Sequence, residues 1–115
     1  MKLSIIVPLY NESELVCITL DRLGKLSLPD FVTFSEIIVV DDCSTDGSFD
    51  IVTGYIKTHE GIRLFKNEKN MGKGASVRVG AMNASGDVLV VQDADLEYDP
   101  SDIGPMLTVM HDNNL

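Results

Sequence analysis

The chain has 115 residues, 44% of them hydrophobic, which suffices for a single domain with a buried core and excludes a disordered chain. Its 18 acidic and 9 basic residues give a net charge of −9 at pH 7, which argues against non-specific binding to nucleic acid, because such binding depends on Lys and Arg neutralising phosphates. This charge does not exclude a phosphorylated small molecule, whose charge a metal ion can neutralise locally.

The first half of the chain predicts two strands and two helices in alternation. Residues 3–9 are a short β-rich apolar run, in which Pro8 suits a strand end. A helix follows, since three- and four-residue spacings place on one face Leu15, Val16, Thr19, Leu20, Leu23 and Leu26. Residues 36–40 (EIIVV) predict a second strand. Residues 48–58 predict a second helix, with inward Ile51, Val52, Tyr55 and Ile56.

The second half continues the alternation. It predicts a strand at 62–65, a helix of small residues at 75–84 closed near Gly86, and a strand at 87–92. Asp99 and Pro100 have the pattern of a helix N-cap followed by proline at the first helical position, and this last helix is expected to reach about residue 112. The methionines at helical spacing are expected in the core, namely Met82, Met106 and Met110.

The order βαβαβαβα predicts an α/β fold with a mostly parallel sheet and flanking helices over residues 1–115. Continuous apolar strands are buried on both faces, and helices between them imply parallel pairing through right-handed crossovers. Ligands of open α/β sheets bind beyond the carboxyl ends of the strands. Polar clusters at 10–12, 41–42 and 93–97 all follow strands, so one crevice is expected to collect them.

The cluster at 93–97 is a candidate metal site. Asp93 and Asp95 point the same way from extended backbone, and two converging carboxylates are costly unless a cation lies between them or one is protonated. Oxygen-only ligands favour Mg²⁺ or Mn²⁺, with Glu97 as a further ligand. A diphosphate could fill the open coordination positions of such a cation. The alternative to a metal site is that residues 93–97 form a solvated acidic turn.

Two more clusters are candidate ligand contacts. Asp41 is the acid we favour for a base N–H or a ribose hydroxyl, and Asp42 is expected to cap its own turn or join the ligand. In the loop at 70–74, Lys73 and backbone N–H groups are suited to phosphate, or the loop is an ordinary helix entry. This is not a Walker A loop, because Asn67 stands where that pattern requires glycine.

Four stretches in this order together resemble family 2 glycosyltransferases with the GT-A fold: SIIVPLYNE, EIIVVDDCSTDG, NMGKGASVRVG and VVQDADLEYDP. NxGKG combined with DADLE resembles the branch of dolichyl-phosphate mannosyltransferases and polyprenyl-phosphate glycosyltransferases. The resemblance implies a Rossmann-like nucleotide-binding half. It places at the nucleoside Pro8, Tyr10, Glu12 and Asp41, and it matches Asp42 to the second nucleotide-sugar-binding acid of the family pair. It places Lys73 and Gly74 beside the nucleotide, makes Asp93 and Asp95 the catalytic metal-binding pair, and offers Glu97 as a further ligand.

Two features depart from the family pattern. Cys43 stands where glycine is usual, which strains the turn if its φ is positive. The length is about half that of a full GT-A domain, so we expect a truncated donor-binding part. Such a part is expected to bind nucleotide weakly, to transfer little sugar, and to self-associate through apolar surface that the other half would cover.

The expected function is transfer of a sugar from a UDP- or GDP-linked donor to an acceptor such as a polyprenyl phosphate, by metal-assisted inverting displacement. The alternatives are a sugar nucleotidyltransferase, disfavoured because PLYNES is neither glycine-rich nor basic, and a non-catalytic nucleotide-binding module. A signalling receiver is also disfavoured, because its acid pair should follow the first strand.

Cysteine content and apolar run lengths favour a cytoplasmic chain. Cys17 and Cys43 are too few for a disulfide framework or a zinc site, so both thiols are expected to be reduced. No apolar run approaches the roughly 18 residues of a membrane span, and the N-terminus lacks the features of a signal peptide. The full-length parent is expected to associate with the cytoplasmic side of a membrane.

Overall fold

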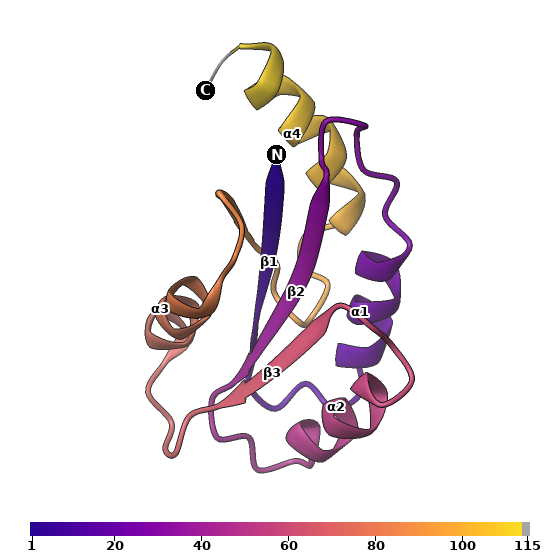
Figure 1. Ribbon diagram of the computed structural model, residues 1–115. Helices are drawn as coiled ribbons and strands as arrows, with labels where there is room; N and C mark the ends of the chain where they lie inside the picture. The colour runs from indigo at the N-terminus through magenta and orange to yellow at the C-terminus, as the bar shows by residue number, and fades with distance from the viewer. Residues whose placement is uncertain (114–115) are drawn as a thin grey trace.

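The computed structural model describes residues 1–113, which alternate strands and helices as the sequence predicts (Figure 1). Within these residues the strands form one four-stranded parallel sheet in the order β3-β2-β1-β4. The elements are β1 (Lys2–Leu9), α1 (Val16–Gly24), β2 (Phe34–Asp41), α2 (Ser48–Ile56), β3 (Ile62–Lys66), α3 (Lys73–Asn83), β4 (Val88–Val91), the 3₁₀ turn η1 (Pro100–Asp102) and α4 (Ile103–Asp112). The predicted α/β class is therefore confirmed.

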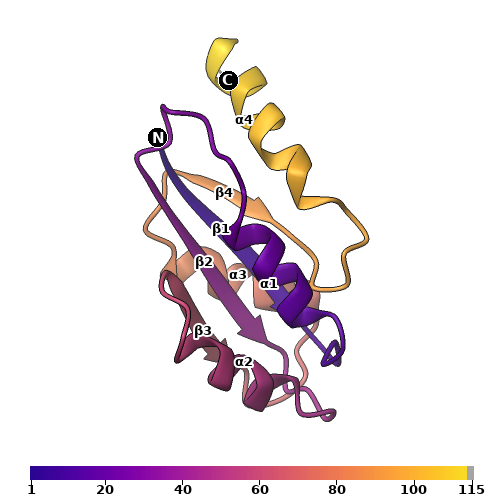
Figure 2. The same ribbon diagram turned by 90° about the vertical axis from the view of Figure 1, so that its right-hand side faces the viewer.

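Helices cover both faces of the sheet. Figure 2 shows α1 and α2 in front of the strands and α3 behind them. On the α1 side, one core unites the odd-numbered residues of β1 with residues of α1, α2 and α4, among them Leu3, Ile5, Val7, Val16, Leu20, Val52 and Leu107. Because β1 and β2 are buried on both faces, their apolar runs are continuous rather than alternating.

The small residues of α3 face the sheet. Ser76 and Gly80 are its buried positions, and a Cβ added at Gly80 would lie 2.6 Å from the side chain of Ile6. The helix therefore packs closely over β1, and a glycine at residue 80 is required by contact rather than by backbone conformation.

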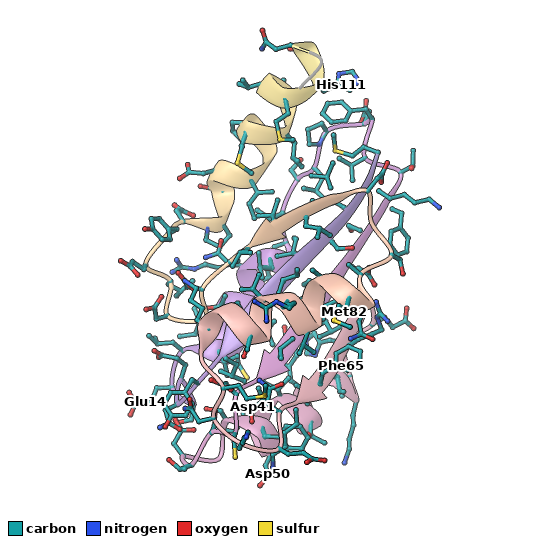
Figure 3. The ribbon with its side chains drawn as sticks, turned by 90° about the vertical axis from the view of Figure 1, so that its left-hand side faces the viewer. Glu14, Asp41, Asp50, Phe65, Met82 and His111 are labelled. Carbon is teal, nitrogen blue, oxygen red and sulfur yellow. The ribbon has the colours of Figure 1, made fainter. Side chains whose placement is uncertain are left out.

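Several expectations about side-chain burial are wrong. Met82 is 80% exposed, since the stripe of α3 that meets the sheet consists of small residues. Figure 3 shows Met82 beside one end of that helix. Met106 and Ile51 are also exposed, at 43% and 39%, because their helices each meet the core along one face only. Met110 packs against the core as expected. Helix α3 begins at Lys73, two residues earlier than predicted.

A buried polar cluster around Glu36 joins the amino-terminal ends of the strands. Its carboxylate accepts hydrogen bonds from Ser4 Oγ (2.7 Å), the Ser85 amide (2.6 Å) and Arg63 (2.8 Å). Burial raises the pKa of Glu36, but these hydrogen bonds and the Arg63 charge outweigh burial and leave the pKa below its ordinary value. The cluster ties β1, β2, β3 and the α3–β4 turn together at the edge opposite the predicted crevice.

No helix within residues 1–113 is both long and apolar enough to cross a membrane.

Candidate functional site

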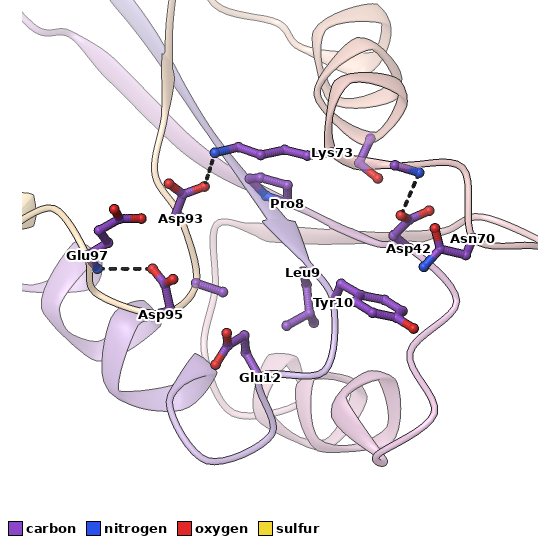
Figure 4. A pocket seen from close by; sticks show the side chains of 13 residues that line it. Pro8, Leu9, Tyr10, Glu12, Asp42, Asn70, Lys73, Asp93, Asp95 and Glu97 are labelled. Carbon is purple, nitrogen blue, oxygen red and sulfur yellow. Dashed lines mark hydrogen bonds and ion pairs between the residues drawn. The ribbon is translucent and has the colours of Figure 1, made fainter.

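A crevice of about 350 Å³ lies at the carboxyl ends of the strands (Figure 4). It brings together eight of the residues expected at the site, namely Pro8, Tyr10, Glu12, Asp42, Lys73, Asp93, Asp95 and Glu97. It also includes Asn70 and Gly72 of the predicted 70–74 loop, Ala94 of the 93–97 cluster, and two residues that the sequence did not single out, Leu9 and Ser76. Asp41 and Gly74 do not line it. The crevice is thus built from the turns that follow β1, β2 and β4 and from the entry to α3.

Three carboxylates converge on one side of the crevice. Oxygens of Asp93, Asp95 and Glu97 all lie within 4.8 Å of one another, close enough to share one cation. The Asp95 carboxylate accepts a hydrogen bond from the Glu97 amide (3.0 Å), and Leu96 between them has a left-handed backbone (φ +62°). Oxygen-only donors of this kind fit Mg²⁺ or Mn²⁺.

The turn that carries these carboxylates is held in place by one buried and one half-buried hydrogen bond. Thr19 Oγ1 of α1 donates to the Ala94 carbonyl (2.7 Å), between the two aspartates. The buried Gln92 donates through Nε2 to the Tyr98 carbonyl (2.8 Å) and so closes the loop. The carboxylates therefore project from a backbone that is fixed on both sides.

Lys73 neutralises part of the negative charge of the three carboxylates. Its Nζ lies 2.5 Å from Asp93 Oδ1, and its side chain is 60% exposed whereas that of Asp93 is 16% exposed. The hydrogen bond to Asp93, together with the charges of Asp93, Glu97 and Tyr98, raises the pKa of Lys73 against the opposing effect of burial. On the opposite side, burial and then the charges of Asp95 and Asp46 raise the pKa of Glu12.

The two adjacent aspartates at the end of β2 have different partners. Asp42 does not cap its own turn, and that interpretation is wrong. Its carboxylate instead accepts hydrogen bonds across the sheet edge from the amides of Met71 (2.7 Å) and Gly72 (2.8 Å) and from Asn67 Nδ2 (3.0 Å). Burial raises the pKa of Asp42, but these bonds outweigh it and lower the pKa overall. Asp42 thereby fixes the loop that leads into α3.

Asp41 is the residue that caps the turn. Its Oδ2 accepts the Ser44 amide (3.1 Å), and the side chain is completely buried and does not line the crevice. Its other oxygen, Oδ1, has no hydrogen-bond partner among residues 1–113. A buried carboxylate oxygen without a donor is costly, so a ligand N–H or O–H reaching it would be well placed.

Glycine is needed at residue 72 rather than residue 74. Gly72 has φ +94°, a conformation that L residues rarely adopt, and it lines the crevice immediately before Lys73. Gly74 lies exposed in the first turn of α3, with nothing within 4 Å of an added Cβ. Gly74 does not line the crevice, and its contact with a nucleotide stays a prediction. The Asn-Met-Gly stretch before the lysine was the sequence signal for the glycine that matters.

Strained backbone marks the turns around the crevice. Asn11 (φ +51°) and Cys43 (φ +61°) are left-handed residues other than glycine that follow β1 and β2, as Leu96 follows β4. Asn11 Oδ1 accepts the Thr45 amide (2.8 Å), which locks the first two turns together. The strain expected where Cys43 replaces the usual glycine is thus present. Strain of this kind is concentrated at functional sites.

Comparison with known proteins defines the class. The sequence model described as Glycosyl transferase family 2 matches residues 4–115, and the chain belongs to this family. The chain is 41% identical over 96 residues to a dolichyl-phosphate beta-glucosyltransferase of Trichomonas vaginalis, covering 78% of this chain and 28% of that protein. It is 34% identical over 113 residues to an undecaprenyl-phosphate 4-deoxy-4-formamido-L-arabinose transferase of Yersinia enterocolitica, covering 94% and 33%.

Solved structures confirm the GT-A fold. A mannosyltransferase of Pyrobaculum calidifontis in complex with GDP-Man and Mn²⁺ superposes with a TM-score of 0.82 at 28% identity, over 94% of this chain and 32% of that chain. Residues 1–349 of TarS from S. aureus in complex with UDP-GlcNAc superpose with a TM-score of 0.79 at 30% identity, over 97% and 32%. The chain spans about a third of the length of the relatives described here.

Proposed function

We propose that this chain supplies the donor-binding part of a glycosyltransferase that moves a sugar from a nucleoside-diphosphate sugar, UDP- or GDP-linked, to an acceptor. The observation that carries the proposal is the convergence of Asp93, Asp95 and Glu97 at one end of a crevice whose other walls come from the turns after β1 and β2. Family membership supports a transferase over a nucleotidyltransferase.

The nucleoside would lie between the turns after β1 and β2. Pro8 and Tyr10 offer an apolar and an aromatic surface, and Tyr10 is 46% exposed, so its ring is free to meet a base. The Oδ1 of Asp41, which has no hydrogen-bond partner among residues 1–113, would accept a hydrogen bond from the base or the ribose. The Asp42 carboxylate already accepts hydrogen bonds from the 67–72 loop, so Asp42 would act by holding that loop rather than by contacting the ligand.

The diphosphate would lie toward the turn after β4. Asp93, Asp95 and Glu97 would hold Mg²⁺ or Mn²⁺, which when bound neutralises the charge that develops on the departing diphosphate. Lys73 stands at the start of α3, where its ammonium and the free backbone N–H groups of the first helical turn favour phosphate. The chain's own residues thus provide positive charge beside the carboxylate cluster.

The reaction proposed is a single in-line displacement. The acceptor oxygen attacks the anomeric carbon from the side opposite the diphosphate, the new C–O bond forms as the bond to the diphosphate breaks, and the configuration inverts. A polyprenyl phosphate is the acceptor we propose, since the named polyprenyl-phosphate relatives belong to the same family. Its phosphate oxygen is already an anion, so the attack needs no strong protein base.

Titration calorimetry with UDP and GDP, each with and without Mn²⁺, tests the donor-binding proposal. We expect binding of one nucleoside diphosphate that depends on Mn²⁺ and weakens by about tenfold or more in Asp95→Asn, because the substitution removes a carboxylate ligand. Asp30→Asn, an exposed acid outside the lining of the crevice, is the charge-matched control and should bind as the unaltered chain does. Nucleotide binding whose affinity is the same with and without Mn²⁺, or no nucleotide binding at all, would contradict the proposal.

A further inference from the structure

Lys73 contacts the carboxylate that the proposed metal would need. The ammonium lies 2.5 Å from Asp93 Oδ1, an oxygen of the three-carboxylate cluster. Among the ion pairs within residues 1–113, this is the one that involves the cluster. A free metal ion arriving at Asp93 must therefore displace a cation that is already bound there.

Both ends of this ion pair are attached to fixed backbone. Asp42 holds the amides of Met71 and Gly72, the two residues directly before Lys73. On the other side, the Ala94 carbonyl next to Asp93 is held by Thr19 (2.7 Å). The lysine side chain itself is 60% exposed, so its ammonium can move away without rearrangement of the helix. The backbone at both residues is thus fixed by the fold, whereas the exposed lysine ammonium is free to leave Asp93.

We infer that Lys73 makes the carboxylate cluster select a metal–nucleotide complex over the free metal ion. The inference rests on the function proposed above. A free divalent ion meets a carboxylate that is already paired, and the displaced ammonium remains close enough to repel it. A metal–diphosphate complex brings phosphate oxygens with which the ammonium pairs after it leaves Asp93. Lys73 therefore opposes the metal when it comes alone and stabilises it when it comes with nucleotide.

This arrangement couples the two ligands. By linkage, any factor by which the nucleotide raises the affinity for metal is the factor by which metal raises the affinity for nucleotide. Lys73 contributes to that factor twice, since it lowers the affinity for the metal alone and raises the affinity for the pair. Its removal should reduce the coupling from both directions.

The test is calorimetric titration of Mn²⁺ into four folded proteins, first alone and then with saturating UDP or GDP, whichever binds. The proteins are the unaltered chain, Lys73→Met, Lys73→Arg and Lys69→Met. Lys69 is an exposed lysine of the same loop outside the lining of the crevice, so Lys69→Met has the same net charge as Lys73→Met. Circular dichroism and thermal unfolding establish that each variant is folded.

We expect Lys73→Met to bind Mn²⁺ alone about fivefold more tightly, as removal of a partly exposed ion pair allows, and to lose most of the coupling to nucleotide. Lys73→Arg should keep the behaviour of the unaltered chain, as should Lys69→Met. If a folded Lys73→Met binds Mn²⁺ alone no more tightly than the unaltered chain, the role of Lys73 is overturned. The same holds if Lys69→Met raises the affinity for Mn²⁺ alone as much as Lys73→Met does. Neither result contradicts the proposed nucleotide binding. Absence of any Mn²⁺-dependent nucleotide binding by the unaltered chain overturns the proposed function, and this inference with it.

Discussion

Asp42→Asn is expected to loosen the entry to α3. Asp42 is 4% exposed, and its carboxylate accepts three hydrogen bonds, two of them from backbone amides. Asparagine has nearly the same size, but it replaces one acceptor oxygen by an NH₂ group that would face a backbone N–H. It also removes the negative charge that strengthens the remaining bonds.

The magnitude follows from these contacts. A hydrogen bond to a charged group contributes about 1.5–3 kcal/mol, and a buried donor left without an acceptor costs about 1–3 kcal/mol. Loss of one backbone bond and weakening of the other two gives an expected decrease of about 3 kcal/mol in the free energy of unfolding at pH 7. The amides of Met71 and Gly72 should also lose protection from hydrogen exchange before the rest of the domain does.

Urea unfolding followed by circular dichroism measures the stability, and hydrogen exchange measures the local opening. Asp30→Asn, which removes an exposed carboxylate, is the matched control and should change the free energy of unfolding by no more than about 0.5 kcal/mol. An Asp42→Asn variant within 1 kcal/mol of the unaltered chain, with the Met71 and Gly72 amides still protected, would refute the assignment of Asp42 as the residue that holds this loop.

Three further substitutions test packing, pH dependence and backbone strain. Gly80→Ala should destabilise by about 1–3 kcal/mol in thermal unfolding, since the added methyl meets Ile6 at 2.6 Å, whereas Gly74→Ala should not, and equal effects would contradict the close packing of α3. The folded-state pKa of Glu36 lies below its ordinary value of 4.5, so its contribution is complete above that pH and is lost as pH falls through the folded pKa. Glu36→Gln should therefore be about 2 kcal/mol less stable at pH 7 and should lose less stability on acidification, and parallel pH profiles would contradict this. Cys43→Gly should stabilise by about 0.5 kcal/mol in urea unfolding by relieving a φ of +61°, and a loss would show that Cys43 makes contacts worth more than the strain.

The parallel sheet and the order of strands and helices along the chain could be predicted from local sequence patterns. The apolar runs at 3–9 and 36–40 became the strands buried on both faces, and Asp99 caps the turn before α4 through the Ser101 amide, as the Asp-Pro pattern predicted. These features depend on residues close together in sequence. Strand ends also fixed where a crevice would lie, because the carboxyl ends of parallel strands share one edge.

The partners of the site residues did not follow from local patterns. Asp42 bonds to residues 25–30 positions away, and no short-range rule distinguishes it from Asp41 on that ground. The period of a strand does separate the two acids by face, since Asp41 lies on the face of β2 that carries Ile37 and Val39, and Asp42 follows on the opposite face, toward the loop before α3. The pairing of Lys73 with Asp93 joins the start of α3 to the loop after β4, 20 positions away, and it depends both on the pairing of β4 with β1 and on the packing of α3 over β1.

The buried polar cluster around Glu36 has a consequence for which parts of the sequence can be varied. It lies at the amino ends of the strands, whereas the turns at 10–13, 43–47, 67–72 and 93–99 follow carboxyl ends. The Glu36 cluster and the proposed donor site therefore lie at opposite ends of the strands. Libraries confined to the exposed residues of these turns should yield folded proteins with altered preference for the proposed donor, because the Glu36 cluster and the buried Asn67 and Ala94 are left untouched.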